Sequence, residues 1–167
     1  MIIITMKYTI ATTRFNGKTW YENCKWCEDN NHDGCIYGLP MLIPDKILTD
    51  APLFVLEMHN DNNKIMGIGL IQNRPLFDKR YKIYNDNYYC QYIYKSNYRI
   101  DREDMTPQQQ KMLEILDILL FTGDTHMKRG RGITCMSKKL LKQGKLNFMT
   151  RIKQMFLEYY TPPSPLG

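Results

Sequence analysis

The most strongly β-prone part of the chain is PLFVLEM at residues 52–58 together with KIMGIGLI at residues 64–71. The segment between these apolar runs, HNDNN, is rich in Asn and Asp, whose side chains favour turns. Two apolar runs on either side of such a turn predict a hairpin of central strands that are buried on both faces. Gly67 and Gly69 alternate on one face of the second strand, where the missing side chains leave room for a helix, another backbone or a flat ligand. Close packing of a helix is the favoured explanation.

The segments on either side of this hairpin predict a mixture of strands and helices. Alternating, β-prone residues predict strands over residues 7–13, 35–38 and 133–135, and one or two more within 81–98. Helical spacing and capping residues predict helices over 19–29, 108–121, 138–143 and 147–159. The helix at 108–121 is the clearest, because Thr106 supplies an N-cap and Pro107 a first-position proline. Thr19 is the predicted N-cap of the first helix, and Glu22 completes a capping box.

The length and composition of the chain predict one α+β domain. A chain of 167 residues that is 43% hydrophobic and 24% charged fits a single domain over residues 1–160. Residues 161–167 are predicted to form a flexible Pro-rich tail. No apolar run reaches the roughly 18 residues of a spanning helix, so no membrane association is expected. Five cysteines, an odd number without a spaced framework, and the absence of a signal-peptide pattern favour free thiols in a cytoplasmic setting.

Positive charge is concentrated in the C-terminal third of the chain. The net charge is +6, and no acidic residue occurs between Asp124 and Glu158. An acidic stretch at residues 22–33 would give the molecule a charge axis that orients it on an anionic partner. This distribution predicts a polyanionic partner, most simply nucleic acid. The basic block contains Lys128, Arg129, Arg131, Lys138, Lys139, Lys142, Lys145, Arg151 and Lys153.

Within this block, residues 124–134 (DTHMKRGRGIT) form a predicted phosphate-binding loop. Two glycines allow backbone N–H groups to turn inward as an anion nest, and the cations add charge and directed donors. The predicted phosphate contacts are His126, Lys128, Arg129 and Arg131. The loop lacks the glycine-to-lysine spacing of a Walker motif, so nucleotide hydrolysis is not predicted. A solvated basic loop without a ligand is the alternative.

A cysteine-rich segment raises the question of zinc. Cys24, Cys27, His32 and Cys35 are four soft ligands within twelve residues, and their pattern resembles the zinc knuckle of nucleocapsid proteins. Only two residues separate His32 from Cys35, whereas the knuckle family has four in that interval. Ordinary thiols are the favoured alternative, and no cofactor is predicted.

The chain offers few groups for catalysis. His32, His59 and His126 lie in separate segments, and no Ser, His and Asp set has the context of a hydrolase. Asp101 with His126 could contribute to a metal-dependent nuclease centre, although helix capping also explains the carboxylates near Asp101. Enzymatic activity is therefore the less favoured alternative.

Two tryptophans suggest a site for a base. Trp20 and Trp26 belong either to the core or to a stacking platform, on which each aromatic face contributes about 1–3 kcal/mol per base. The order of elements resembles the PUA-like group that includes the EVE and YTH domains, which read modified bases. The matching segments are residues 8–13, one of the two tryptophans, residues 54–60 and residues 65–70.

This resemblance implies a curved mixed sheet or pseudo-barrel with flanking helices. The base pocket expected with it consists of Trp20, Trp26, Thr13, Asn16 and Tyr37. Segments at residues 13–16, 19–20, 34–40, 55–58, 67–71, 99–102 and 126–130 also look like a family of small proteins encoded by large DNA viruses. That second resemblance implies the host cytoplasm as the setting.

Together these features predict a nucleic-acid-binding module. We expect RNA or another single strand, with a base, modified or not, in an aromatic pocket and phosphates on the basic loop. RNA is favoured because the PUA-like resemblance points to it. A viral interaction protein with an acidic protein partner and a metal-dependent nuclease are the alternatives.

Overall fold

The predicted hairpin is confirmed and forms the centre of the fold in a computed structural model that describes residues 6–161. Strands β3 (Pro52–His59) and β4 (Lys64–Gln72) pair antiparallel, with a bulge between Leu56 and Met58. β1 (Thr9–Phe15) lies parallel to β3, and β6 (Tyr98–Asp101) lies antiparallel to β4. A two-residue strand, β7 (Thr134–Cys135), pairs with the outer edge of β1. The result is a five-stranded mixed sheet in the order β6-β4-β3-β1-β7.

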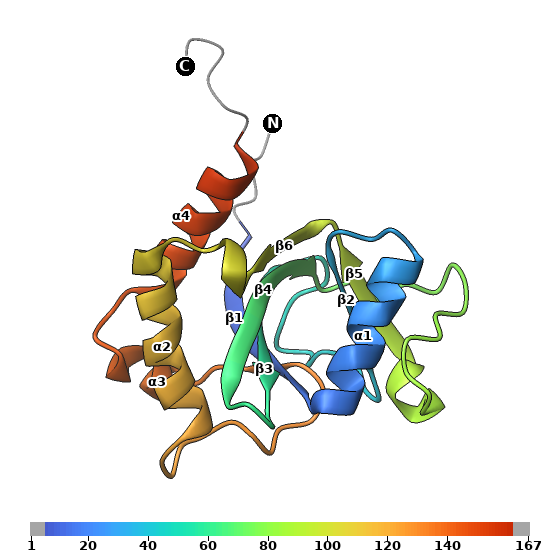
Figure 1. Ribbon diagram of the computed structural model, residues 1–167, viewed down its shortest axis with the longest axis horizontal. Coiled ribbons are helices and arrows are strands. Elements are labelled where there is room, and N and C mark those ends of the chain that lie inside the picture. Colours follow the sequence, from blue (N-terminus) through green and yellow to red (C-terminus); the bar gives the residue numbers. More distant parts are fainter. Residues whose placement is uncertain (1–5, 162–167) are drawn as a thin grey trace.

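A second, smaller sheet covers one face of this sheet (Figure 1). It consists of β2 (Cys35–Leu39) and β5 (Tyr92–Ser96), paired antiparallel. The helix α1 (Gly17–Asp29) and the 3₁₀ turn η1 (Asn87–Cys90) lie on the same side of the molecule. The apolar side chains between the two sheets include Ala11, Leu53 and Val55. Odd-numbered residues of β1 and β3 therefore face the second sheet, as the period-two alternation of a strand requires.

Three helices cover the opposite face (Figure 1). They are α2 (Pro107–Phe121), α3 (Lys138–Gln143) and α4 (Phe148–Tyr160), and η2 (Arg102–Asp104) precedes α2. The even-numbered side chains Ile10, Phe54 and Leu56 pack against them. Among residues 6–161, no helix is long and apolar enough to cross a membrane.

The predicted helix starts are confirmed for the last three helices. Thr106 caps α2 in a capping box with Gln109, Ser137 caps α3, and Asn147 caps α4. For α1 the predicted start is wrong, because Asn16 is the N-cap and Thr19 makes the reciprocal bond of the capping box. Threonine can serve either as the N-cap or as the third residue of a capping box, so the residue type alone does not show where the helix begins.

Two further expectations require correction. The sheet does not close into a pseudo-barrel, because its edge strands β7 and β6 contribute only two and four residues and the β2–β5 pair stacks as a separate sheet. One of the strands expected within residues 81–98 is confirmed as β5, whereas residues 81–91 form loop and η1, where the side chain of Asp86 caps η1 by accepting a hydrogen bond from the Tyr88 N–H. Of the expected tail at residues 161–167, all but Thr161 lies outside the described residues.

The two glycines of β4 make room for side chains and not for a helix. A Cβ atom on Gly69 would lie 2.1 Å from the Tyr37 hydroxyl, and one on Gly67 would lie 2.6 Å from the Arg99 guanidinium. The Tyr37 and Arg99 side chains pass over β4 at these glycines and reach Glu57, which is 2% exposed. The glycines thus allow a buried polar cluster between the sheets.

In this cluster the carboxylate of Glu57 is fully paired. The Arg99 guanidinium donates to it at 2.7 and 3.0 Å, and the Tyr37 hydroxyl donates at 2.8 Å. Arg99 also donates to Asp101 at 3.0 Å, and its guanidinium lies 5.8 Å from the centre of the Trp20 ring. Burial by itself lowers the pKa of Arg99, but the neighbouring charge and hydrogen bonds of Glu57 raise it above its ordinary value.

We predict that Arg99→Met lowers the free energy of unfolding by about 3–5 kcal/mol, because it leaves the buried Glu57 carboxylate without its counter-charge. The double change Glu57→Gln with Arg99→Met should recover much of that loss. Urea denaturation followed by circular dichroism measures both. The control is Arg74→Met, which breaks an exposed ion pair with Asp50 and should leave the midpoint unchanged. An equal loss in Arg74→Met would contradict the role of burial.

Candidate functional site

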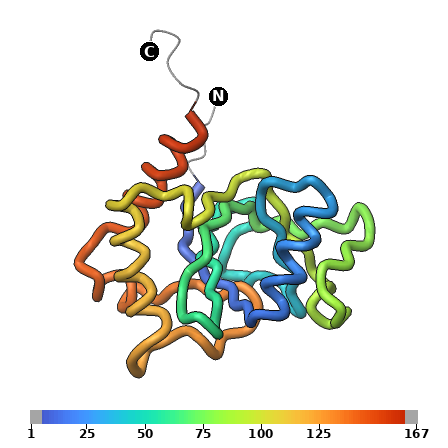
Figure 2. The backbone as a smooth tube through the Cα atoms, viewed as in Figure 1, coloured from blue at the N-terminus to red at the C-terminus, as the bar shows by residue number. Residues whose placement is uncertain are grey.

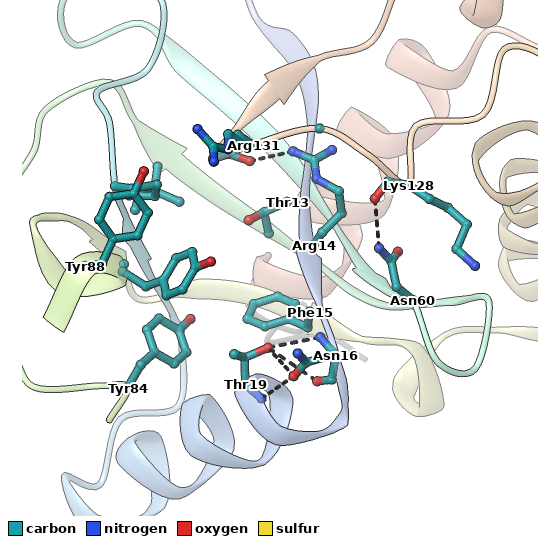
Figure 3. Close-up of a pocket in the computed structure, with 16 residues that line it drawn as sticks. Thr13, Arg14, Phe15, Asn16, Thr19, Asn60, Tyr84, Tyr88, Lys128 and Arg131 are labelled. Carbon is teal, nitrogen blue, oxygen red and sulfur yellow. Dashed lines mark hydrogen bonds between the residues drawn. The ribbon is translucent and has the colours of Figure 1, made fainter. Parts of the chain in front are cut away.

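A cavity of about 300 Å³ opens where the parallel strands β1 and β3 end. We call it the β1 cavity (Figure 3). The carboxyl ends of parallel strands are a common location for ligand sites, because the loops that follow them diverge there. Among residues 6–161, no acidic side chain lines the cavity. Its lining residues are Thr13, Arg14, Phe15, Asn16, Thr19, Gly38, Leu39, Pro40, Asn60, Tyr84, Tyr88, Tyr89, Lys128, Gly130, Arg131 and Gly132.

The cavity brings together residues that the sequence assigned to two different sites. Thr13 and Asn16 were predicted at a base pocket, and Lys128 and Arg131 at a phosphate site. The predicted phosphate-binding loop at residues 124–134, called the basic loop below, lies beside the end of β1. Its residue Gly132 contacts Arg14 of β1, 118 residues earlier in the chain, and Figure 2 shows the orange segment beside the blue one. Phosphate contacts and a base wall can therefore belong to one site.

One wall of the cavity is the end of strand β1. Thr13 is on the face directed toward the second sheet and is 5% exposed. Its hydroxyl points into the cavity (Figure 3), and no described residue forms a hydrogen bond with it. The neighbouring Thr12 is different, because its hydroxyl accepts a hydrogen bond from Arg14 at 2.9 Å.

The facing wall is aromatic. Tyr84 is buried, and its hydroxyl accepts a hydrogen bond from Asn23. Tyr88 and Tyr89, on η1, are 44% and 43% exposed, and their rings meet edge to face at 5.2 Å. Exposed tyrosine rings beside a cavity offer the flat, partly apolar surface on which a base can stack.

The third side is the basic loop. The Lys128 carbonyl accepts a hydrogen bond from the Asn60 side chain at 2.9 Å, and its ammonium donates to Asn63 at 2.7 Å. The Arg131 side chain is exposed and forms no hydrogen bond with a described residue, so its guanidinium is available to a ligand. Gly132 has φ +61°, a left-handed conformation that glycine adopts without strain. Arg131 is thus the cation of this loop whose charged group is free beside the cavity, since the Lys128 ammonium is already bound to Asn63.

Arg14 holds this loop in place. Its guanidinium donates to the carbonyls of Met127 and Gly132 at 3.2 and 2.6 Å and to the Thr134 hydroxyl at 2.9 Å. A Cβ atom on Gly130 would lie 2.6 Å from the guanidinium carbon, so a larger residue there would displace the guanidinium from its partners. Burial lowers the pKa of Arg14 to about 10, which leaves it charged at neutral pH. Arg14 is thus a cation at the cavity with neutral partners only.

The helix α1 begins at the base of the cavity, but its N-terminus already has partners. The side chain of Asn16 accepts from the Thr19 N–H at 2.8 Å, and the Asp61 carboxylate accepts from the Gly17 N–H at 2.7 Å. A negative ligand at the start of α1 would meet the charge of Asp61. The basic loop is therefore the side of the cavity that favours an anion.

Several predicted residues lie elsewhere. Trp20 and Trp26 are half-buried against the core between the sheets, and neither lines the cavity. Tyr37 is 1% exposed and its hydroxyl is bound to Glu57, so its ring has no free face for a base.

The other two predicted phosphate contacts also lie outside the cavity lining. His126 uses Nδ1 to accept a hydrogen bond from the Lys128 N–H, and Arg129 is exposed to solvent. The sequence missed Arg14, Tyr88 and Tyr89. A charged residue in an otherwise buried strand was the available signal for Arg14.

The four residues of the suggested zinc site do not converge. Cys35 is buried with its thiol directed to the Tyr98 carbonyl, and Cys24 is exposed on α1. His32 Nε2 lies 3.0 Å from the Cys35 carbonyl oxygen. Within residues 6–161, no three His, Cys, Asp or Glu side chains are grouped as metal ligands.

We predict that Arg14→Met loosens the basic loop and lowers the free energy of unfolding by about 1–3 kcal/mol, because it removes charged hydrogen bonds to carbonyl oxygens of the loop. Hydrogen exchange followed by mass spectrometry should show faster exchange across residues 126–134. The matched control is Arg129→Met, which removes the same charge from the loop without removing a described hydrogen bond. Equal exchange in the two variants would refute the role assigned to Arg14.

We also predict that iodoacetamide labels Cys24 well before Cys35 in the native protein at neutral pH. Burial raises the pKa of Cys35 to about 12 and that of Cys27 to about 11, so both remain thiols, and Cys35 is also inaccessible. Peptide mass spectrometry after timed labelling measures the order. Protection of both Cys24 and Cys27, together with one zinc ion released per chain on denaturation, would establish the zinc site instead.

Comparison with known proteins adds no external assignment. No family model, curated protein or solved structure matches the chain. The resemblance to PUA-like domains therefore stays a prediction, and the site is interpreted from its own geometry.

Proposed function

We propose that the chain binds single-stranded nucleic acid, with one nucleotide in the β1 cavity and its phosphate on the basic loop. The observation that carries this proposal is the composition of the cavity. Cations line one side, exposed tyrosine rings line the other, and no acidic side chain lies among them. Phosphate recognition requires the first feature and base stacking the second.

The size of the cavity favours a single strand. A volume of about 300 Å³ is at the lower end of ligand pockets and can hold roughly one nucleotide. A base within a duplex is paired and stacked, so it would have to leave the helix to enter. An unpaired strand avoids that cost. RNA is the first ligand to test, because the PUA-like resemblance points to it.

Further cations lie away from the cavity. The exposed cations of α3 and the following turn form no ion pair with a described acidic side chain, and they are Lys138, Lys139, Lys142 and Lys145. Lys138 and Lys142 line a hollow with Ile10, at the start of β1 and not at the end where the β1 cavity opens. Binding in the cavity should weaken with salt, because each phosphate that its cations neutralise releases a counterion.

The nuclease alternative receives no comparable support. Asp101, its proposed carboxylate, accepts hydrogen bonds from Arg99 and from the Glu103 N–H and does not line the β1 cavity. The proposal is accordingly a binding function and not a reaction.

We predict that Lys128→Ala with Arg131→Ala weakens binding of a short fluorescein-labelled single-stranded RNA. The slope of log affinity against log salt should decrease by roughly 0.7 for each phosphate that the variant no longer neutralises. Fluorescence anisotropy over a series of salt concentrations measures affinity and slope together.

The matched control is Arg80→Ala with Lys111→Ala, which removes the same charge from exposed positions outside the cavity lining. This control should keep the wild-type affinity to within about twofold, since distant exposed charges are screened. Binding that is indifferent to salt would overturn the proposal. Equal competition by polyglutamate would instead support the alternative of an acidic protein partner.

A further inference from the structure

We propose that the Thr13 hydroxyl reads the edge of the base in the β1 cavity, which makes Thr13 a specificity-determining residue. This inference rests on the proposed function. It adds that the site discriminates between bases, whereas phosphate contacts and stacking alone accept any of them.

The first observation is that the Thr13 hydroxyl has no partner among the described residues. Thr13 is 5% exposed, yet no described backbone or side-chain group forms a hydrogen bond with its hydroxyl. The fully buried side-chain atoms without a partner among the described residues are Arg14 Nε and Asn60 Oδ1, and the Thr13 oxygen is not one of them. The Thr13 hydroxyl is therefore open to the cavity, where a ligand can reach it.

Two other threonine hydroxyls near Thr13 have a structural role, because both are bound by Arg14. The Thr12 hydroxyl accepts from Arg14 at 2.9 Å, and the Thr134 hydroxyl accepts from the same guanidinium at 2.9 Å. Both help to hold the basic loop. Thr13 points to the opposite face of the strand from Thr12 and takes no part in that network.

The second observation is the position of the hydroxyl within the cavity. Figure 3 shows the Thr13 side chain directed from β1 into the space that faces Tyr88, with Arg131 beside the same space. A base stacked on Tyr88 or Tyr89 with its phosphate near Arg131 would present an edge to β1. Enzymes that read an unstacked base combine stacking with hydrogen bonds to such an edge.

The chemistry of a hydroxyl fits this task. A threonine hydroxyl can donate one hydrogen bond and accept others, so it can pair with a carbonyl oxygen, a ring nitrogen or an exocyclic amine. Because the strand backbone and the surrounding core fix Thr13, the hydroxyl can satisfy one arrangement of donors and acceptors better than another. A base that displaces water from this hydroxyl without pairing with it binds less tightly.

The test compares Thr13→Val with Thr13→Ser. Anisotropy titrations with labelled oligo(A), oligo(C) and oligo(U) RNA give the order of affinities in the wild type. We expect Thr13→Val to weaken the preferred oligonucleotide by roughly threefold to tenfold, the effect of one hydrogen bond, and to leave the others nearly unchanged. Thr13→Ser keeps the hydroxyl and should keep the order. The salt slope should be the same in all three proteins.

The possible failures are distinguishable. If the wild type binds neither the RNA nor the DNA oligonucleotides, the proposed function fails and this inference fails with it. If the wild type binds with salt sensitivity but Thr13→Val keeps the full preference, only this inference is overturned. If Thr13→Val lowers the affinity for every RNA equally and leaves the affinity for oligo(dA), oligo(dC) and oligo(dT) unchanged, the hydroxyl contacts the ribose and not the base. That result would also overturn this inference. Urea denaturation must show Thr13→Val to be at least as stable as the wild type, since a loss of stability would reveal a structural role for the hydroxyl.

Discussion

The buried carboxylate of Glu57 is the interaction on which the two-sheet architecture depends. It lies on the central strand β3 and is bound by Tyr37 from the small sheet and by Arg99 from the edge of the large one. A carboxylate in such a place is tolerated only when its lone pairs and its charge are satisfied. The cluster also requires Gly67 and Gly69, because larger residues at these positions would block the Arg99 and Tyr37 side chains that reach the carboxylate. The Tyr37 hydroxyl thus ties the small sheet to the central strand, and Arg99 balances the charge of the carboxylate that it binds.

The β1 cavity is a consequence of that fixed arrangement. One wall belongs to the large sheet and another to the segments that surround the small one, so the cavity exists only while the sheets keep their separation. Arg14 fixes the basic loop against β1, since it binds several oxygen atoms that are distant in sequence. A site held in this way is formed before a ligand arrives, and binding then costs less ordering entropy.

Within the proposed site, affinity and selectivity come from different residues. Lys128 and Arg131 supply charge, which attracts any phosphate backbone and depends on salt. Tyr88 and Tyr89 supply stacking, which every base can use. Thr13 adds a hydroxyl that lines the cavity and that no described residue binds, and it is the proposed group for distinguishing one base from another. Variants at these positions are therefore expected to change different measurable quantities.

The local elements of this protein could be predicted from its sequence. The hairpin of residues 52–72, the cap of α2 at Thr106 and the basic loop follow from periodicity, capping chemistry and charge, which act over a few residues. Three outcomes required the folded chain: the sheet stays open, the Tyr37 hydroxyl is bound to Glu57, and Arg14 meets a loop more than a hundred residues away. Those outcomes depend on contacts between segments far apart in the chain, and neither the spacing nor the composition of either segment specifies its partner.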